Sequence, residues 1–367
     1  MNKFPETTPA AAYTFNLPQQ IRPICIIGAG GIVRDAHLPA YRKAGYQVWG
    51  IVNRTKARAV ALAAEFGIPF VFDELAEALS VAPKECVFDI AVMPEQYEEV
   101  LEALPDGAGV LIQKPLGNDL ETARRLQSIC ERKNLVAAVN TQLRFAPYVE
   151  KARALIANGL LGEIFDFKIS VSVNTPWELF PHVFGAKRLE ISMHSVHYID
   201  LVRSFFGDPT SVSAITVEHP DKSNIASTRS TIIFRYRDRP LRAVIDTNHD
   251  NNFGTKYQAS FIEIQGTKGA IRIQMGLLLD YPKGGHDSLE LYLQSESGRG
   301  WQSLPFDGSW FPDAFMGSMG ALLRFLEGSN SDLPTSVEDV IKTMALVEGA
   351  YESSASEGIT MQEVGLK

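Results

Sequence analysis

A glycine-rich turn directly after the first apolar run of the chain has the residue types needed to bind phosphate. The apolar run covers residues 23–27, and the turn reads Gly28-Ala29-Gly30-Gly31-Ile32-Val33. A pyrophosphate approaches main-chain amides closely only where no Cβ intrudes, and the N-terminus of a following helix adds a positive dipole end. We therefore predict that a dinucleotide binds at Gly28, Gly30, Gly31 and Ile32. A plain tight turn is the alternative, because Val33 takes the third position of the G-x-G-x-x-G pattern.

The residues after the second predicted strand decide which nicotinamide coenzyme fits. An Asp or Glu there would bind the ribose 2′-OH of NAD and repel the 2′-phosphate of NADP. The chain instead has Asn53 and Arg54. Asn53 is neutral, and Arg54 can pair with a phosphate or stack on adenine. The sequence favours NADP and leaves NAD open; a basic start to a solvated helix at Arg54 and Lys56 is the alternative.

A lysine stands where the fifth predicted strand ends, in Gln113-Lys114-Pro115. The carboxyl ends of parallel strands face the crevice where ligands bind in such folds. An ammonium there can polarise a substrate oxygen, or relay its proton as hydride leaves the adjacent carbon. Elsewhere a Lys-Pro pair is usually part of a solvated loop, so the chemistry expected of Lys114 depends on its position.

The elements that would position these residues alternate between strand and helix. Strands are predicted at 23–27, 46–52, 69–72, 87–92, 109–112 and 136–139, and helices at 35–43, 55–66, 74–79, 95–104 and 120–133. This order is typical of βαβ units with a parallel sheet and right-handed crossovers. We predict an N-terminal tail over 1–20 and an α/β Rossmann domain over 21–140.

The pattern changes in residues 141–367, where long alternating stretches follow one another. Strands are predicted at 164–173, 211–217, 227–236, 241–248, 257–265 and 270–275, and helices at 148–158, 191–206, 315–326 and 337–354. We predict a substrate-binding α+β domain with an open, mostly antiparallel sheet. An exposed apolar face on that sheet would be covered by another copy of the chain, as a homodimer or homotetramer.

Composition restricts the partners and the compartment. The 367 residues exceed the usual size of one core, which favours two domains. A net charge of −8 argues against nucleic acid and against an anionic membrane surface. The three cysteines lie far apart, as expected in a reducing compartment without a disulfide or zinc site. Without a signal peptide or a long apolar run, we expect a cytoplasmic protein.

Taken in order, the motifs resemble the glucose–fructose oxidoreductase/inositol dehydrogenase (Gfo/Idh/MocA) family over nearly the whole chain after the tail. The residues that carry the resemblance are the glycine turn, His37-Leu38-Pro39-Ala40, Pro94, Gln113-Lys114-Pro115, Asn140, Arg144-Phe145, Pro147, His197-Tyr198-Ile199-Asp200, 266–269, Glu338-Asp339 and 351–358. The resemblance implies that Lys114 contacts the substrate oxygen and the nicotinamide ribose. It implies that His197 is the general acid/base, and it places Pro94, Gln113 and Asn140 beside the coenzyme.

Two positions depart from the family pattern. Gln113 replaces a Glu beside Lys114, and Met193 stands four residues before His197, where Asp is frequent. His194 lies three residues before His197 and shares its side of the predicted helix, so it is a second catalytic candidate. The alternatives are that His194 packs against the sheet and that His197 is a satisfied core histidine.

Several polar and aromatic residues are candidates for a substrate pocket. Besides the catalytic candidates Lys114, His194 and His197, they are Arg144, Trp177, His182 and Arg188. Trp177 as simple packing and Arg188 as a surface residue are the alternatives. The polar stretch 246–252 would line a sugar pocket or form a turn, and we favour the turn. We expect no metal site, because His194 and His197 lack a third ligand nearby.

The expected function is hydride transfer between NAD(P) and a hydroxyl of a sugar, polyol or related cyclic substrate. One alternative is a non-catalytic NAD(P)-binding sensor, which the altered positions Val33, Gln113 and Met193 would fit. Another is an enzyme of the same fold that uses bound NAD for hydrolysis or elimination at a sugar ring, with no net redox change. Retention of both proton-handling residues, Lys114 and His197, favours a dehydrogenase.

Overall fold

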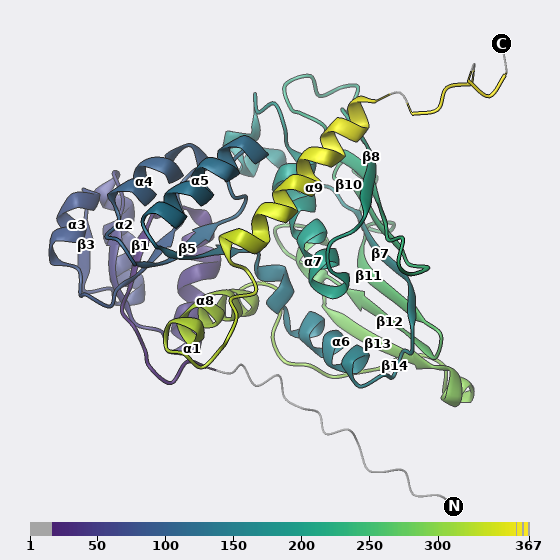
Figure 1. Ribbon diagram of the computed structural model, residues 1–367, viewed down its shortest axis with the longest axis horizontal. Helices are drawn as coiled ribbons and strands as arrows, with labels where there is room; N and C mark the ends of the chain where they lie inside the picture. Colours follow the sequence, from purple (N-terminus) through teal and green to yellow (C-terminus); the bar gives the residue numbers. More distant parts are fainter. Residues whose placement is uncertain (1–16, 357, 362, 366–367) are drawn as a thin grey trace, which may run out of the picture. The chain divides into compact units, whose positions relative to one another are not determined.

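The computed structural model describes residues 17–356, 358–361 and 363–365, and it divides into two compact units (Figure 1). The first unit contains the chain up to Glu150 together with Phe306–Met344, and the second contains Lys151–Pro305 and the residues from Ala345 onward. The sequence-based division placed 306–344 in the second domain. These residues pack with the first unit because the apolar helix α8 (Asp313–Leu326) contributes to its core. The predicted tail lies, up to residue 16, outside the described residues.

The first unit is built on a six-stranded parallel sheet, as predicted. Its order is β3-β2-β1-β4-β5-β6, which is the doubly wound dinucleotide-binding order. The strands are β1 (Ile24–Ile27), β2 (Val48–Val52), β3 (Phe70–Phe72), β4 (Val87–Ile90), β5 (Gly109–Gln113) and β6 (Val136–Asn140). β1, β4 and β5 are buried along their whole length, which explains their unbroken apolar runs.

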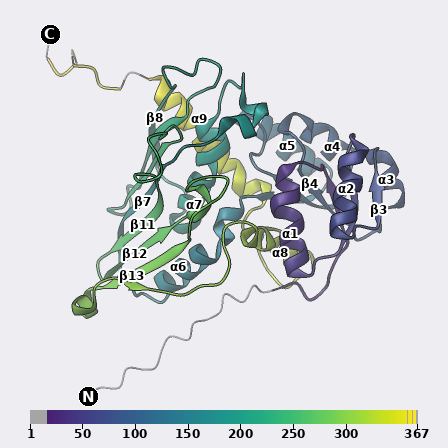
Figure 2. The same ribbon diagram turned by 180° about the vertical axis from the view of Figure 1, so that it is seen from behind.

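Helices cover both faces of this sheet (Figures 1 and 2). They are α1 (Leu38–Ala44), α2 (Lys56–Phe66), α3 (Leu75–Val81), α4 (Tyr97–Ala103), α5 (Leu120–Arg132) and α8. α4 packs against α5 on one side, and α1 packs against α8 on the other. A π-helical turn, η1 (Val33–His37), precedes α1 and begins where the glycine turn ends.

The second unit is built on an eight-stranded sheet of order β14-β13-β12-β11-β7-β10-β9-β8. The strands are β7 (Ile164–Ser172), β8 (Ser211–Val217), β9 (Arg229–Arg235), β10 (Arg242–Asn248), β11 (Ala259–Gly266), β12 (Gly269–Gln274), β13 (Ser288–Leu293) and β14 (Gln302–Ser303). Only β7 and β10 pair in parallel, which confirms the mostly antiparallel sheet. β13 and β14 were not predicted.

Three further helices are α6 (Pro147–Ala157), α7 (Val196–Phe206) and α9 (Val337–Ala355). A second π-helical turn, η6 (Glu190–Ser195), leads into α7. Phe205 and Phe206 at the end of α7 pack on Phe167 of β7. The sheet therefore buries one face under α7 and leaves the other open.

The open face of the second sheet is mixed rather than apolar, which corrects the expectation. Ile215 and Ile233 are exposed on β8 and β9. Across the remaining strands the same face carries the ion pairs Arg242–Asp166 and Arg272–Glu263. Alternation fixes which side chains point outward, but it does not make those side chains apolar.

Two other findings bear on the sequence-based expectations. Cys25, Cys86 and Cys130 are all buried free thiols, and burial raises the pKa of Cys86 and Cys130 to about 12. None of the three is therefore suited to act as a thiolate nucleophile. In the part of the chain that the structure describes, no helix combines the length and apolarity needed to cross a bilayer.

Candidate active site

The glycine turn has one position where protein atoms leave no room for a side chain and one where they do. Gly28 has φ +121°, and a Cβ built on it would lie 2.3 Å from the carbonyl oxygen of Ala91. Its amide donates to the Val52 carbonyl over 2.8 Å. A Cβ on Gly30 would meet no atom within 4 Å. Gly28 thus lets β1 approach its neighbouring strands, whereas Gly30 offers bare backbone to a ligand. This arrangement fits a pyrophosphate.

Val33 does not obstruct the turn, although it replaces the usual third glycine or alanine. Its side chain is fully buried in the core that contains Ile24, Leu38 and Ala40. The residue is the first of the π turn η1. The departure from the G-x-G-x-x-G pattern is therefore taken up by packing beneath the turn.

Asn53 and Arg54 differ in what they contact. The Oδ1 of Asn53 accepts a hydrogen bond from the amide of Ala29 at 3.1 Å, and its Nδ2 donates to the Thr55 carbonyl at 2.9 Å. Asn53 thus ties the glycine turn to the end of β2. Arg54 is exposed and forms no hydrogen bond or ion pair with the residues described. It is the residue at this strand end available to a coenzyme phosphate.

Lys114 follows β5 and is half-buried. Removal from water lowers the pKa of its amine from the ordinary 10.5 to about 8. Such an amine gains and loses a proton near neutral pH, which suits proton transfer. The peptide bond from Lys114 to Pro115 is cis. The preceding carbonyl, that of Gln113, accepts a hydrogen bond of 2.6 Å from Tyr97 Oη.

A buried polar network leads inward from Gln113. Its Oε1 accepts from Asn140 Nδ2 at 2.9 Å, and the same Nδ2 lies 3.4 Å from His37 Nε2. His37 Nδ1 lies 2.6 Å from Asp89 Oδ2, and both side chains are completely buried. Asn140 Oδ1 is buried without a hydrogen-bond partner, so it can accept from a bound ligand. Asp89 was missed by sequence reasoning, although an Asp inside an apolar strand was a signal.

The second unit gathers aromatic and titratable side chains from three segments. The imidazoles of His194 and His249 stack with their centroids 4.4 Å apart and their planes at 27°. The indole of Trp177 lies 5.6 Å from His194 and 5.7 Å from His249. His249 belongs to the polar stretch that we assigned to a turn. It is almost fully buried and contacts Glu190, which the sequence analysis did not consider.

Asp250, also in that polar stretch, is tied into the structure. It accepts from Lys222 Nζ at 2.6 Å and from the hydroxyl of Thr228. Burial alone would raise the pKa of Asp250, but these hydrogen bonds outweigh it and lower the pKa. Asp250 therefore secures the segment that carries His249.

Two predicted substrate residues, Arg144 and Arg188, form ion pairs within the protein. Arg144 donates to the Pro334 carbonyl and to Asp339, both at 2.7 Å. Arg188 forms a bidentate pair with Glu348 at 2.6 and 2.7 Å and stacks over Tyr351. Both guanidinium groups are engaged by the protein itself, so the structure adds no support to a substrate role for either.

The histidines His182 and His197 lie outside the stacked group. His182 is exposed on a short 3₁₀ turn, with its ring centroid 6.4 Å from that of Phe180. His197 is buried in the first turn of α7. Met193, the apolar replacement for the family's Asp, packs against the small cluster of Trp177 and Val183. Of the predicted substrate residues, the structure brings Trp177 and His194 together.

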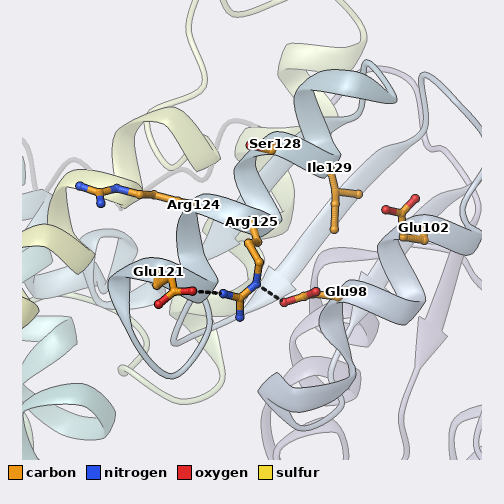
Figure 3. A pocket seen from close by; sticks show the side chains of 7 residues that line it. All are labelled: Glu98, Glu102, Glu121, Arg124, Arg125, Ser128 and Ile129. Carbon is orange, nitrogen blue, oxygen red and sulfur yellow. Dashed lines mark hydrogen bonds and ion pairs between the residues drawn. The ribbon is translucent and has the colours of Figure 1, made fainter.

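A separate surface pocket lies between α4 and α5 of the first unit (Figure 3). It is lined by Glu98, Glu102, Glu121, Arg124, Arg125, Ser128 and Ile129. Arg125 bonds Glu98 and Glu121 at 2.9 Å, so charged groups of the pocket already satisfy one another. It contains none of the predicted site residues.

Among the residues that the structure describes, no three His, Cys, Asp or Glu side chains converge as metal ligands would.

Known proteins resemble the chain in both of its units. Residues 22–141 match the model of an oxidoreductase family with an NAD-binding Rossmann fold, Gfo/Idh/MocA, and residues 149–272 match the C-terminal domain of the same family. D-apiose dehydrogenase of Paraburkholderia graminis is 25% identical over 346 residues, which are 92% of this chain and 88% of that one.

The chain is also similar to a second relative and to a solved structure. D-xylose 1-dehydrogenase (NADP⁺) 2 of Haloferax volcanii is 24% identical over 260 residues, 70% of this chain and 76% of that one. The structure of a levoglucosan dehydrogenase in complex with NADH and levoglucosan superposes with a TM-score of 0.74 at 19% identity, covering 92% and 97% of the two chains. The chain belongs to the Gfo/Idh/MocA family of NAD-binding oxidoreductases.

Proposed function

We propose that the protein is an NAD(P)-dependent dehydrogenase that oxidises a secondary or anomeric hydroxyl of a sugar, polyol or related cyclic substrate. The observation that carries the proposal is Lys114, a partly desolvated amine at the carboxyl end of a parallel strand. The open backbone at Gly30 lies at the carboxyl end of another strand of the same sheet. Relatives named for D-apiose and D-xylose support a sugar as substrate.

The predicted site residues divide into those for the coenzyme and those for the substrate. Gly28, Gly30, Gly31, Ile32, Asn53, Arg54, Pro94, Gln113, Lys114 and Asn140 would hold the coenzyme, which supplies the hydride acceptor when bound. Lys114 polarises the substrate oxygen, and His197 or His194 accepts its proton. Trp177 offers a flat apolar face to a sugar ring. Arg144, His182 and Arg188 stay untested predictions for substrate binding.

NADP is the preferred coenzyme in this proposal. No carboxylate follows β2, and Arg54 is exposed and uncommitted at that strand end. The D-xylose relative named for NADP⁺ supports the same choice. We further propose a cytoplasmic homodimer or homotetramer, which light scattering can test. The buried, free thiols fit a reducing compartment.

The decisive experiment replaces Lys114 with Met and follows the nicotinamide absorbance with a panel of aldoses, inositols and other polyols. Turnover is expected to fall about 10²- to 10⁴-fold, while NADPH binding, followed by its fluorescence, is retained. Lys84→Met, an exposed lysine of the same unit, is the matched control and should leave turnover unchanged. An active Lys114→Met variant would refute the role of Lys114.

The same panel separates the other two functions. Tight NADPH binding without turnover of any substrate would favour a sensor. Product formation without net coenzyme reduction would favour hydrolysis or elimination at a sugar ring.

A further inference from the structure

We propose that Tyr97 is a positioning residue for Lys114, because its hydroxyl holds the main chain directly before this lysine. The proposal rests on the dehydrogenase function proposed above, in which the Lys114 amine polarises the sugar oxygen. Tyr97 was not a candidate in the sequence, since it stands 16 positions before Gln113 on another element of the first unit.

The fold brings Tyr97 to the carboxyl end of β5. The residue begins α4, which follows a 3₁₀ turn, η2 (Pro94–Gln96), beyond the end of β4. β4 and β5 pair side by side in the parallel sheet. From α4 the Tyr97 side chain reaches across to β5, where its Oη donates to the Gln113 carbonyl oxygen at 2.6 Å.

Tyr97 is suited to be a permanent donor. Its side chain is completely buried, and burial raises the pKa of the phenol above its ordinary value of 10. The group therefore keeps its proton near neutral pH. Loss of the donor would leave the Gln113 carbonyl without a replacement for its hydrogen bond to water, which is costly in a buried place. The contact between Tyr97 and Gln113 is thus a stable feature of the native state.

The planarity of the peptide bond carries the effect of this contact to Lys114. The carbonyl oxygen of Gln113 and the Cα of Lys114 belong to the same planar unit, which rotates only as a whole. Fixing the oxygen therefore fixes the Lys114 Cα and the direction in which the side chain starts. A displacement of about 1 Å from the reacting atoms can cost roughly 10²-fold in rate, so this anchor bears directly on turnover.

The chain after Lys114 is held as well. The ring of Pro115 restricts its φ, and the Pro115 carbonyl accepts from the Gly117 amide at 2.9 Å. Gly117 has φ +79°, and a Cβ on it would lie 2.8 Å from Cγ2 of Thr122 in α5. Every residue from 111 to 117 except Lys114 is buried. Lys114 is thus the partly exposed point of a segment that is fixed on both sides.

The side chain of Gln113 adds a second attachment but no charge. Its Oε1 accepts from Asn140 Nδ2 at 2.9 Å, which ties the ends of β5 and β6 together. A neutral amide cannot attract the Lys114 ammonium as a carboxylate at this position would. The placement of the amine therefore depends more on the main chain, and Tyr97 holds the last carbonyl before it.

Tyr46 provides a matched control within the same unit. Its hydroxyl also donates to a main-chain carbonyl, that of Met316, at 3.0 Å, and its side chain is also buried. Tyr46 precedes β2, so it lies at the amino edge of the parallel sheet, opposite the edge that carries Lys114. Tyr97→Phe and Tyr46→Phe remove the same kind of hydrogen bond, and only the first of these bonds is connected to Lys114.

The first test compares the steady-state kinetics of the two variants with the sugar or polyol found in the panel above. Tyr97→Phe should lower kcat about tenfold, while the KM for the sugar and the Kd for NADPH stay within about twofold. Tyr46→Phe should keep kcat within about twofold, although urea denaturation should show a similar loss of stability in both variants. Equal kcat values in the two variants would overturn the positioning role.

Amide hydrogen exchange followed by mass spectrometry tests the anchor without substrate or coenzyme. In Tyr97→Phe the peptide covering residues 113–119 should exchange about tenfold faster, while peptides from β1 stay unchanged. Tyr46→Phe should leave the exchange of 113–119 unchanged. Faster exchange there, without turnover of any sugar by the unmodified chain, would disprove the proposed function alone. Unchanged exchange alongside normal sugar oxidation would disprove the role of Tyr97 alone.

A second variant keeps the test decisive if Tyr97→Phe does not fold. Replacement of Tyr97 by 4-aminophenylalanine keeps the ring and puts an N–H donor where the hydroxyl was. Because the donor to the Gln113 carbonyl is retained, kcat should stay within about threefold of the unmodified chain. A folded 4-aminophenylalanine variant whose kcat falls tenfold or more would contradict the role of the hydrogen bond.

Discussion

The two units each bury a histidine beside a carboxylate, but the two pairs differ in the distance between the ring nitrogen and the carboxylate oxygen. In the first unit His37 Nδ1 lies 2.6 Å from Asp89, and Tyr41 Oη donates to the same oxygen at 2.7 Å. In the second unit His249 Nε2 lies 3.7 Å from Glu190, and His249 also stacks on a second imidazole. The first pair joins a π turn, a helix and a strand within a core, whereas the second pair lies beyond hydrogen-bond distance.

The largest expected effect is a difference in stability between variants of the two carboxylates. Asp89→Asn replaces the buried oxygen shared by His37 and Tyr41 with part of a neutral amide, and it should lower the free energy of unfolding by about 2–3 kcal/mol. Glu190→Gln keeps the bond from Ser195 and should cost about 1 kcal/mol. Urea denaturation of both variants measures the difference. Equal losses would mean that the pair in the second unit is as structural as the first.

Two glycines of one turn also differ in whether protein atoms leave room for a side chain. Gly28→Ala places a methyl group 2.3 Å from the Ala91 carbonyl at φ +121°, so we expect it to lose about 2 kcal/mol of stability or more. Gly30→Ala meets no protein atom, so stability should stay within about 0.5 kcal/mol while the Kd for NADPH rises about tenfold. Denaturation and fluorescence titration check the pair. Unchanged NADPH affinity in Gly30→Ala would place the phosphates elsewhere.

A smaller effect is expected among the basic residues that follow β2. Arg54 is exposed and uncommitted, whereas Lys56 is ion-paired with Asp73 at 3.3 Å. Arg54→Ala should weaken NADPH binding about fivefold, near 1 kcal/mol, and leave NADH binding nearly unchanged. Lys56→Ala is the matched control and should alter neither affinity. Equal weakening of NADH and NADPH in Arg54→Ala would show that Arg54 contacts a part that the two coenzymes share.

The fold was largely predictable because its signals are local. Runs buried on both faces marked β1, β4 and β5, and their order along the chain implied the parallel sheet. The glycine turn and Lys114 were found for the same reason, since each follows directly from the end of a strand. The glycines and the lysine could therefore be located without any knowledge of tertiary contacts.

The rest of the site depends on contacts that the sequence does not show. His249 meets Glu190 only because one residue follows β10 and the other begins a π turn. Arg144 and Arg188 looked like sugar-binding residues by type, but each pairs with an acid 195 or 160 positions away. A guanidinium group alone does not reveal whether a ligand or the protein satisfies it.

Lys114 is half-buried, so it lies between the positions that protein atoms enclose and those that are open to a ligand. Its titration is expected to have the smallest effect on stability. Burial lowers its pKa to about 8, against 10.5 ordinarily. Between these pH values the unfolded chain binds more protons than the folded chain, so this group makes the native state more stable as pH rises. Below pH 8 both states are protonated, and the full cost of burying the charge is present.

Lys114→Met removes this titration and should raise the free energy of unfolding at pH 7 by about 0.5–1 kcal/mol, because the half-buried amine keeps part of its hydration. The difference from the unmodified chain should shrink between pH 8 and pH 10, and urea denaturation at pH 7 and pH 9.5 measures it. Such a stability gain, together with lost turnover, would mark Lys114 as an open position kept for chemistry at the expense of stability. If the difference in free energy of unfolding stays constant across this range, the folded chain compensates the Lys114 charge. Lys114 would then be a structural residue enclosed by the protein.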